Sequence, residues 1–193
     1  MERTTIYLVR HAHSTYTPDE YGRGLSQKGT ADANKVTELM TEHQVDVVLS
    51  SPYRRAIATV EGIAKEIGQD VIVVENLKER LLAGNPVEDF NAAINAVWSD
   101  ETFSFVGGES NVDARRRGVQ ELKRILRTYE GKNVVIGTHG NIMVLLMSYF
   151  DDRYDVTFWK SLDMPDIYKL SFHAEDLDHV ERIWSAPQKQ TTS

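Results

Sequence analysis

Cysteine is absent from this sequence of 193 residues. Without it, the protein can form no disulfide, use no thiol nucleophile and bind no zinc through thiolates. The absence is typical of the reducing cytoplasm, where we expect the protein to be located. Because 41% of its residues are hydrophobic, the chain can bury a core without a disulfide or a metal.

Long hydrophobic runs are also missing. The longest, IMVLLMSYF at 142–150, is much shorter than the roughly 20 residues of a membrane helix. Residues 1–13 have neither the basic start nor the apolar stretch of a signal peptide. We therefore expect a soluble protein with no leader and no contact with a membrane.

Positive charge is scarce, since 22 Lys and Arg residues stand against 29 Asp and Glu residues, for a net charge of −7. This balance argues against general affinity for nucleic acid. The one basic run, ARRRG at 114–118, has acidic neighbours and is typical of one face of a helix. The sequence does not fix an oligomeric state.

Apolar, β-branched segments alternate with segments of helical periodicity, which predicts an α/β fold. We expect a three-layer α/β/α sandwich with a mostly parallel sheet and an antiparallel edge strand. One domain should span 1–186, followed by a disordered tail at 187–193. The expected strands are 4–9, 45–50, 70–77, 133–138, 167–172 and 179–184, and the expected helices are 25–43 (capped by Ser26), 51–68, 86–98, 111–131 and 139–150.

Polar residues follow four of the expected strands. Arg10 and His11 follow the first, Ser50 and Ser51 end the second, Glu79 follows the third and His139 follows the fourth. Since ligands of parallel sheets bind outside the carboxyl ends of the strands, we expect these residues to meet in one crevice.

The candidate site residues are rich in guanidinium and imidazole groups. Guanidinium groups in an acidic protein suit a localised anion, and their geometry matches phosphate bidentately. A neutral imidazole beside a bound phosphate can attack phosphorus, and a carboxyl group such as Glu79 can protonate the leaving alkoxide. The candidates are Arg10, His11, His13, Ser14, Arg54, Arg55, Glu79, Arg80 and His139.

The segment LVRHAHS at 8–14 resembles the signature of the histidine phosphatase superfamily, the phosphoglycerate-mutase-like proteins. Five later segments resemble further family segments in the same order, so the resemblance runs from about residue 6 to about residue 145. These segments are LSQKG (25–29), SSPYRRAIAT (50–59), LKERLLAG (77–84), GGES (107–110) and VVIGTHGN (134–141).

The resemblance implies an α/β/α fold and a role for five residues. It makes His11 a transiently phosphorylated nucleophile and Glu79 the proton donor, with no metal and no other cofactor. Arg10, Arg55 and His139 would bind the phosphoryl group of a small phosphorylated substrate. In two places the sequence departs from the family pattern, because Ala12 replaces a usual glycine and His13 a usual glutamate or glutamine.

For Ser14, Arg80 and Glu109 the sequence leaves two roles open. Ser14 donates to phosphate or caps the loop, and Arg80 reaches the ligand or pairs with Glu109. Glu109 either acts as an acid together with Glu79 or makes a structural hydrogen bond. Arg54 is expected on the helix surface, and the role of His13 stays open.

We expect a metal-independent phosphomonoester hydrolase that works through phosphohistidine. A mutase is the alternative, although the roughly 50 residues between Arg55 and Gly107 leave little for a lid that excludes water. A metal-dependent hydrolase using His11 and His13 fits less well, because alternate residues of an extended segment point to opposite faces. A further alternative is a protein that binds phosphate esters without catalysing a reaction, although every expected catalytic residue type is present.

Substrate specificity is expected in residues 80–110. The segment carries Phe90, Trp98, Phe103 and Phe105, which line an apolar entrance or belong to the core.

Overall fold

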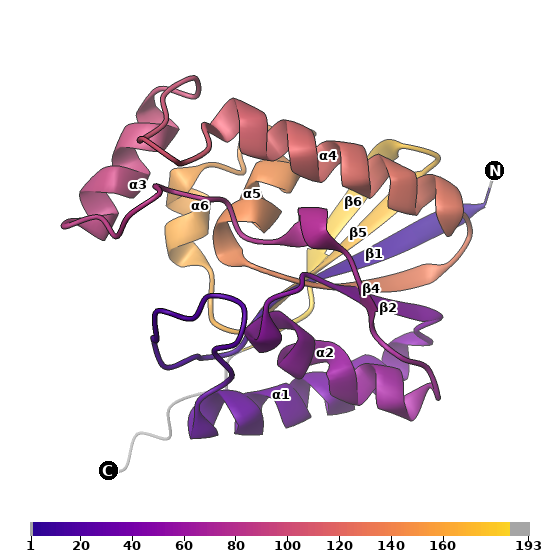
Figure 1. Ribbon diagram of the computed structural model, residues 1–193. Coiled ribbons are helices and arrows are strands. Elements are labelled where there is room, and N and C mark those ends of the chain that lie inside the picture. Colours follow the sequence, from indigo (N-terminus) through magenta and orange to yellow (C-terminus); the bar gives the residue numbers. More distant parts are fainter. Residues whose placement is uncertain (1, 186–193) are drawn as a thin grey trace, which may run out of the picture.

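The computed structural model describes residues 2–185 and is built around one six-stranded sheet with the strand order β3-β2-β4-β1-β5-β6 (Figure 1). The expected tail at 187–193 lies outside this range. No helix in the described part of the chain is long and apolar enough to cross a membrane. The strands are β1 (Arg3–Arg10), β2 (Val47–Ser50), β3 (Ile72–Val73), β4 (Asn133–Thr138), β5 (Asp166–His173) and β6 (Asp176–Arg182).

The sheet is parallel from β3 to β1 and antiparallel beyond. Strand β4 runs parallel to both β1 and β2, while β5 pairs antiparallel with β1 and with β6. The expected mostly parallel sheet with an antiparallel edge is thus confirmed. Since β1 and β4 lie side by side at the centre, the residues that follow them are neighbours.

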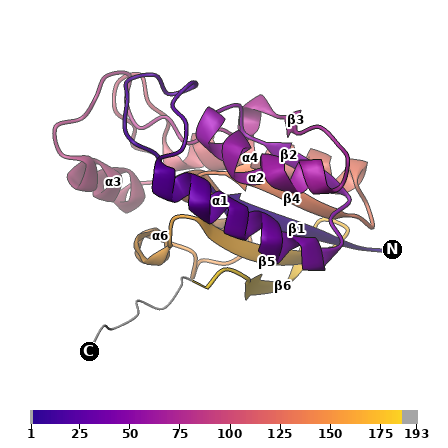
Figure 2. The same cartoon turned by 90° about the horizontal axis from the view of Figure 1, so that it is seen from below.

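Helices cover both faces of the sheet and complete the three expected layers (Figures 1 and 2). Helices α1 (Gln27–Met40) and α2 (Arg54–Glu66) lie on one face, and α4 (Asn111–Thr128) and α5 (Gly140–Ser148) on the other. Strand β1 contributes side chains to the hydrophobic cores on both faces of the sheet, because successive side chains of a strand point to opposite faces. Ile6 and Leu8 join the core under α4 and α5, whereas Tyr7 and Val9 join the core under α1 and α2.

Side-chain caps fix where several helices begin. The hydroxyl of Ser26 accepts a hydrogen bond from the N–H of Gly29, which confirms this residue as the cap of α1. Asp89 caps α3 (Phe90–Ser99) in the same way, so this helix begins four residues later than expected. Such caps satisfy N–H groups that have no partner within the helix.

The largest remaining differences from expectation are at two strands and one helix. The strand expected at 70–77 is limited to β3, and the chain then forms a 3₁₀ helix (Glu75–Leu77) that turns Leu77 into the core. Strand β6 begins at Asp176 instead of 179, because the turn before it is tight and holds Ala174 at a φ of 52°. Helix α6 (Val156–Ser161), capped by Asp155, was not expected from the sequence.

Candidate active site

His11 and His139 lie next to each other at the carboxyl ends of β1 and β4. Arg10 and Thr138 are paired in the sheet, so the two histidines that follow them are adjacent. Their ring centroids are 5.2 Å apart in an edge-to-face arrangement. The centre of the sheet therefore brings together two imidazoles that are 128 residues apart in the chain (139 − 11).

The ring of His11 is buried, with 8% of the residue exposed. Its Nδ1 lies 2.7 Å from the carbonyl oxygen of Ala12, and since a carbonyl only accepts, Nδ1 carries the proton. Burial lowers the pKa of His11 to about 3, and the positive charges of Arg55 and Arg10 add to the effect. The imidazole is therefore neutral at pH 7, and its Nε2, which has no hydrogen-bond partner in the described part of the chain, keeps a free lone pair.

His139 precedes α5 and is buried almost completely, at 1% exposure. Its Nε2 lies 2.7 Å from the hydroxyl oxygen of Ser51, whereas its Nδ1 has no partner among the described residues. Burial, together with the charge on nearby groups, lowers the pKa of His139 well below its ordinary value.

The guanidinium of Arg10 packs over Gly140, the first residue of α5. A Cβ atom at Gly140 would lie 2.8 Å from Arg10 Nε and 2.9 Å from its Cζ, so a side chain there would displace the guanidinium. Arg10 donates to the carbonyl oxygen of Asp163 at 3.3 Å, while its buried Nε has no partner in residues 2–185. Burial lowers the pKa of Arg10, but a guanidinium stays protonated at any working pH.

Arg55 extends from the first turn of α2 and is 2% exposed. Its guanidinium lies 4.7 Å from the centre of the Tyr53 ring. It donates to the carbonyl oxygen of Glu20 at 2.9 Å and to the carboxylate of Glu20 at 3.1 Å. The carboxylate of Glu20 is therefore an anion already held by this arginine.

Glu79 is tied to the N-terminus of α5. Its Oε1 accepts from the N–H groups of Arg80 and Ile142, both at 2.8 Å, and its Oε2 accepts from the N–H of Asn141 at 3.0 Å. Since a carboxylate oxygen has two lone pairs, Oε2 keeps one that no hydrogen bond within residues 2–185 uses. The acid thus lies at the N-terminus of α5, the helix that His139 directly precedes.

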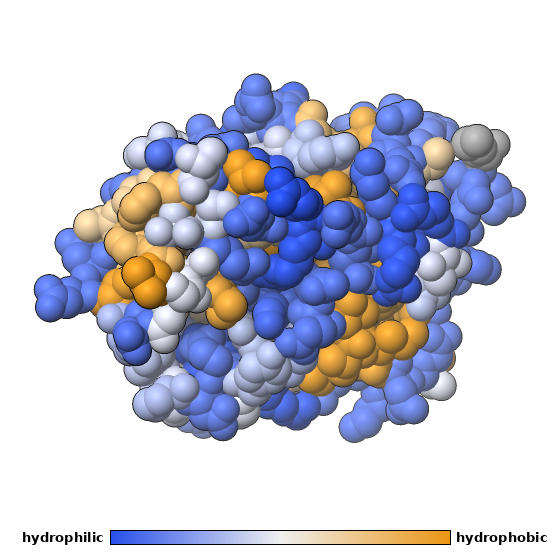
Figure 3. Space-filling model, turned by 45° about the horizontal axis from the view of Figure 1, so that its top comes forward, coloured by the Kyte–Doolittle hydropathy of each residue, from blue (hydrophilic) through white to orange (hydrophobic). Residues whose placement is uncertain are grey.

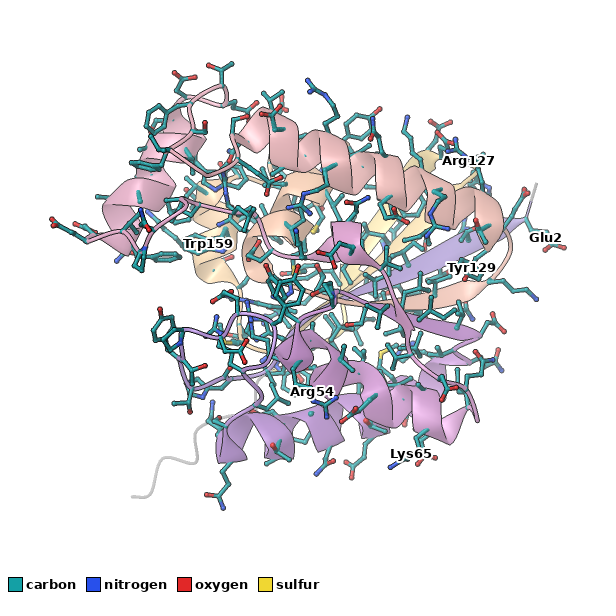
Figure 4. The ribbon with its side chains drawn as sticks, in the orientation of Figure 1. Glu2, Arg54, Lys65, Arg127, Tyr129 and Trp159 are labelled. Carbon is teal, nitrogen blue, oxygen red and sulfur yellow. The ribbon has the colours of Figure 1, made fainter. Side chains whose placement is uncertain are left out.

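Three other candidate residues form hydrogen bonds with partners other than His11 and His139. Ser14 donates to the carbonyl oxygen of Gly24 at 2.6 Å, which caps the loop. His13 is exposed and lies 2.7 Å from the hydroxyl of Ser26. Arg54 forms an exposed ion pair with Glu61 on the outside of α2, as expected (Figure 4).

Arg80 is buried, but its terminal nitrogens donate to the side chain of Asn111 and to the carbonyl oxygen of Glu109. The carboxylate of Glu109 instead accepts hydrogen bonds from Nε and Nη2 of Arg117 and from the N–H of Leu81. Burial raises the pKa of Glu109, but these hydrogen bonds outweigh it and leave the pKa below its ordinary value. The structure therefore favours a structural role for Glu109, and it joins Arg80 to the backbone of Glu109 and not to its carboxylate.

Two residues near the site, Arg23 and Glu20, were not predicted from the sequence, and both lie in the loop at 14–24. Arg23 contributes to the low pKa of His11, pairs with Glu20 at 3.4 Å and has a buried Nε without a partner in the described chain. It stands between two glycines directly before α1. That position was the available signal, but neither residue directly follows a strand, and the crevice was predicted only from residues at strand ends.

The aromatic residues of 80–110 divide between core and surface. Trp98 is partly buried against the core under α4 and α5 and donates to the side chain of Asn141 at 3.2 Å. Phe90 and Phe103 are 53% and 38% exposed, and Phe90 lies 6.2 Å from Trp159, measured between ring centres. Figure 3 shows apolar surface gathered over α3 and its neighbouring loops.

No three His, Cys, Asp or Glu side chains among residues 2–185 are grouped as a metal ion would require. His11 is buried and His13 is exposed, and each uses Nδ1 for a different partner.

Fold and site together define a class: an α/β/α protein with two histidines and two arginines gathered at the carboxyl ends of its central strands. The chain belongs to the histidine phosphatase superfamily (branch 1), which it matches over residues 6–182.

Curated relatives are distant. The chain is 25% identical over 194 aligned positions to a bifunctional protein of Mycobacterium tuberculosis, with 93% of this chain and 53% of that protein covered. It is 29% identical to a metal-independent phosphoserine phosphatase of Arabidopsis thaliana, covering 74% of this chain and 66% of the relative. The chain thus spans about half the length of the mycobacterial relative.

Solved structures share the fold. A mycobacterial glucosyl-3-phosphoglycerate phosphatase superposes with a TM-score of 0.74 at 22% identity, covering 94% of this chain and 97% of that one. A phosphoserine phosphatase from Entamoeba histolytica gives a TM-score of 0.76 at 19% identity, covering 96% and 98%. At these identities, the likeness establishes the fold alone.

Proposed function

We propose that the protein is a metal-independent phosphomonoester hydrolase that works through a phosphohistidine. The observation that carries the proposal is the neutral, buried His11, whose Nδ1 is bound to Ala12 and whose Nε2 is free. Imidazole nitrogen is a nucleophile only when it is neutral, and the nearby guanidinium groups supply the charge that holds a phosphate.

In the first step, Nε2 of His11 attacks phosphorus and the ester P–O bond breaks. The leaving alkoxide takes a proton from Glu79, for which we assign Oε2 because it keeps an unused lone pair. Arg10 and Arg55 stabilise the negative charge of the phosphoryl group during transfer. The N–H groups at the start of α5 orient Glu79.

In the second step, water attacks the phosphohistidine and the P–N bond breaks. Glu79 takes the proton from this water, which restores both groups and releases inorganic phosphate. A mutase would instead return the phosphoryl group to its product, and a relative of Arabidopsis thaliana, 29% identical, is named phosphoglycerate mutase-like.

The experiment is a screen of the purified protein against phosphorylated metabolites, with phosphate release and mutase activity measured side by side. Phosphoserine and phosphorylated glycerates belong in the panel because of the relatives' names. We expect phosphate release that EDTA leaves unchanged and vanadate inhibits. Isomerised phosphoester without phosphate release would favour the mutase, and a large loss in EDTA would revive the metal-dependent hydrolase.

A further inference from the structure

Ser51 is buried, and its side chain contacts the site residue His139. The residue is 0% exposed. Its hydroxyl oxygen accepts a hydrogen bond from the N–H of Tyr53 at 3.1 Å and lies 2.7 Å from His139 Nε2. The hydroxyl has one proton and two lone pairs, so the proton's direction decides the form of the histidine.

Two arrangements of the protons are possible. If His139 carries its proton on Nε2, that proton goes to Ser51, and the buried Ser51 hydroxyl then has no acceptor among the described residues. If Ser51 donates to Nε2, its hydroxyl is satisfied and the proton of His139 lies on Nδ1. Leaving a buried polar group without a partner is costly, so the second arrangement is favoured.

The second arrangement leaves a single unpaired group, the Nδ1–H of His139, which is buried without a partner in residues 2–185. This ring lies edge to face with that of the nucleophile, His11. An N–H at this place can donate to a phosphoryl oxygen, whereas a bare Nδ1 lone pair would repel one.

We propose that Ser51 is a positioning residue that holds His139 as the Nδ1–H tautomer, ready to donate to the phosphoryl group. The inference rests on the proposed function, because a phosphoryl oxygen is the acceptor. It also makes a claim about the free protein, which can be measured without any substrate.

The first measurement is the two-bond ¹H–¹⁵N spectrum of the histidine rings, which distinguishes the two neutral tautomers. We expect the His139 signals of the wild type to show Nδ1–H, and titration with inorganic phosphate to move them. In Ser51→Ala we expect a mixture of tautomers and a fall in kcat of about 10- to 100-fold, the usual effect of losing one oriented donor.

The neighbouring Ser50→Ala is the matched control. Ser50 is equally buried, but its hydroxyl donates to the carbonyl oxygen of Ser51 and makes no hydrogen bond to His139. We expect this variant to keep the Nδ1–H tautomer and its kcat to within about twofold, as for a neutral hydrogen bond of small net value.

A wild type with Nε2–H on His139 would overturn the inference, as would Nδ1–H retained in Ser51→Ala. If Ser51→Ala loses this tautomer but the wild type hydrolyses no monoester, the proposed function is wrong and the role of Ser51 stands.

Discussion

The chemistry at residue scale depends on which nitrogen or oxygen of a side chain is left free. His11 uses Nδ1 for Ala12 and keeps Nε2, and Glu79 uses three of its four lone-pair positions for backbone N–H groups. The sequence indicated both residue types but could not indicate these partners. Sequence spacing places a side chain near a strand end, whereas the free atom depends on the surrounding backbone.

Replacement of Glu79 by Gln tests the proton donor. We expect kcat to fall by about 100-fold or more for an alkyl phosphate, whose leaving group needs a proton, and by less than about tenfold for 4-nitrophenyl phosphate. The second substrate is an internal control, since damage to the N-terminus of α5 would slow both reactions. Equal losses on the two esters would remove Glu79 from the role of acid.

At the scale of elements, two central strands place the histidines and one loop adds what the sequence analysis missed. One mostly parallel sheet was expected from the alternating strands and helices, but the strand order that places β4 beside β1 was not predicted. The loop at 14–24 shows neither helical nor strand periodicity. Nothing in its sequence therefore predicted that the carboxylate of Glu20 would bind the guanidinium of Arg55. Similarly, the apolar run at 70–77 predicted a full strand, but Leu77 is buried by a 3₁₀ turn instead.

The loop makes a prediction about affinity. Glu20 holds Arg55 and lies 3.4 Å from Arg23, so a substrate phosphate must compete with this carboxylate. We expect Glu20→Gln to lower KM and the inhibition constant of inorganic phosphate by about two- to fivefold, the size of an ion pair with one exposed partner.

Glu61→Gln is the control for that prediction, because Glu61 pairs with the neighbouring but exposed Arg54. Steady-state kinetics and phosphate inhibition measure both variants. An unchanged or raised KM in Glu20→Gln, with Glu61→Gln equal to wild type, would show that Glu20 does not compete.

At the scale of the whole molecule, burying two neutral imidazoles links the site to stability. Burial lowers the pKa of His11 to about 3, from 6.5 in the unfolded chain, and lowers that of His139 in the same direction. Between these pH values, the unfolded chain binds a proton that the folded chain excludes. The contribution of these neutral imidazoles to the free energy of unfolding is therefore fully present above pH 6.5. It is lost as the pH falls toward 3.

We expect the free energy of unfolding of wild type to fall between pH 6.5 and pH 4, with each imidazole contributing about 1.4 kcal/mol per pH unit at most. Urea unfolding at several pH values measures it, and His11→Asn should reduce the slope. The exposed His173→Asn serves as the matched control. A His11→Asn slope equal to that of wild type would mean that His11 gains its proton in the folded state as readily as in the unfolded one.

The most direct test of the central claim is to trap the phosphoryl group on the enzyme. The protein is mixed with a ³²P-labelled monoester that it hydrolyses and quenched in alkali, which preserves phosphohistidine, and the labelled peptide is then identified. We expect acid-labile phosphate on His11 in the wild type and none in His11→Ala. A hydrolysing wild type with label on another residue, or label that survives in His11→Ala, would contradict the assignment of His11 as the nucleophile.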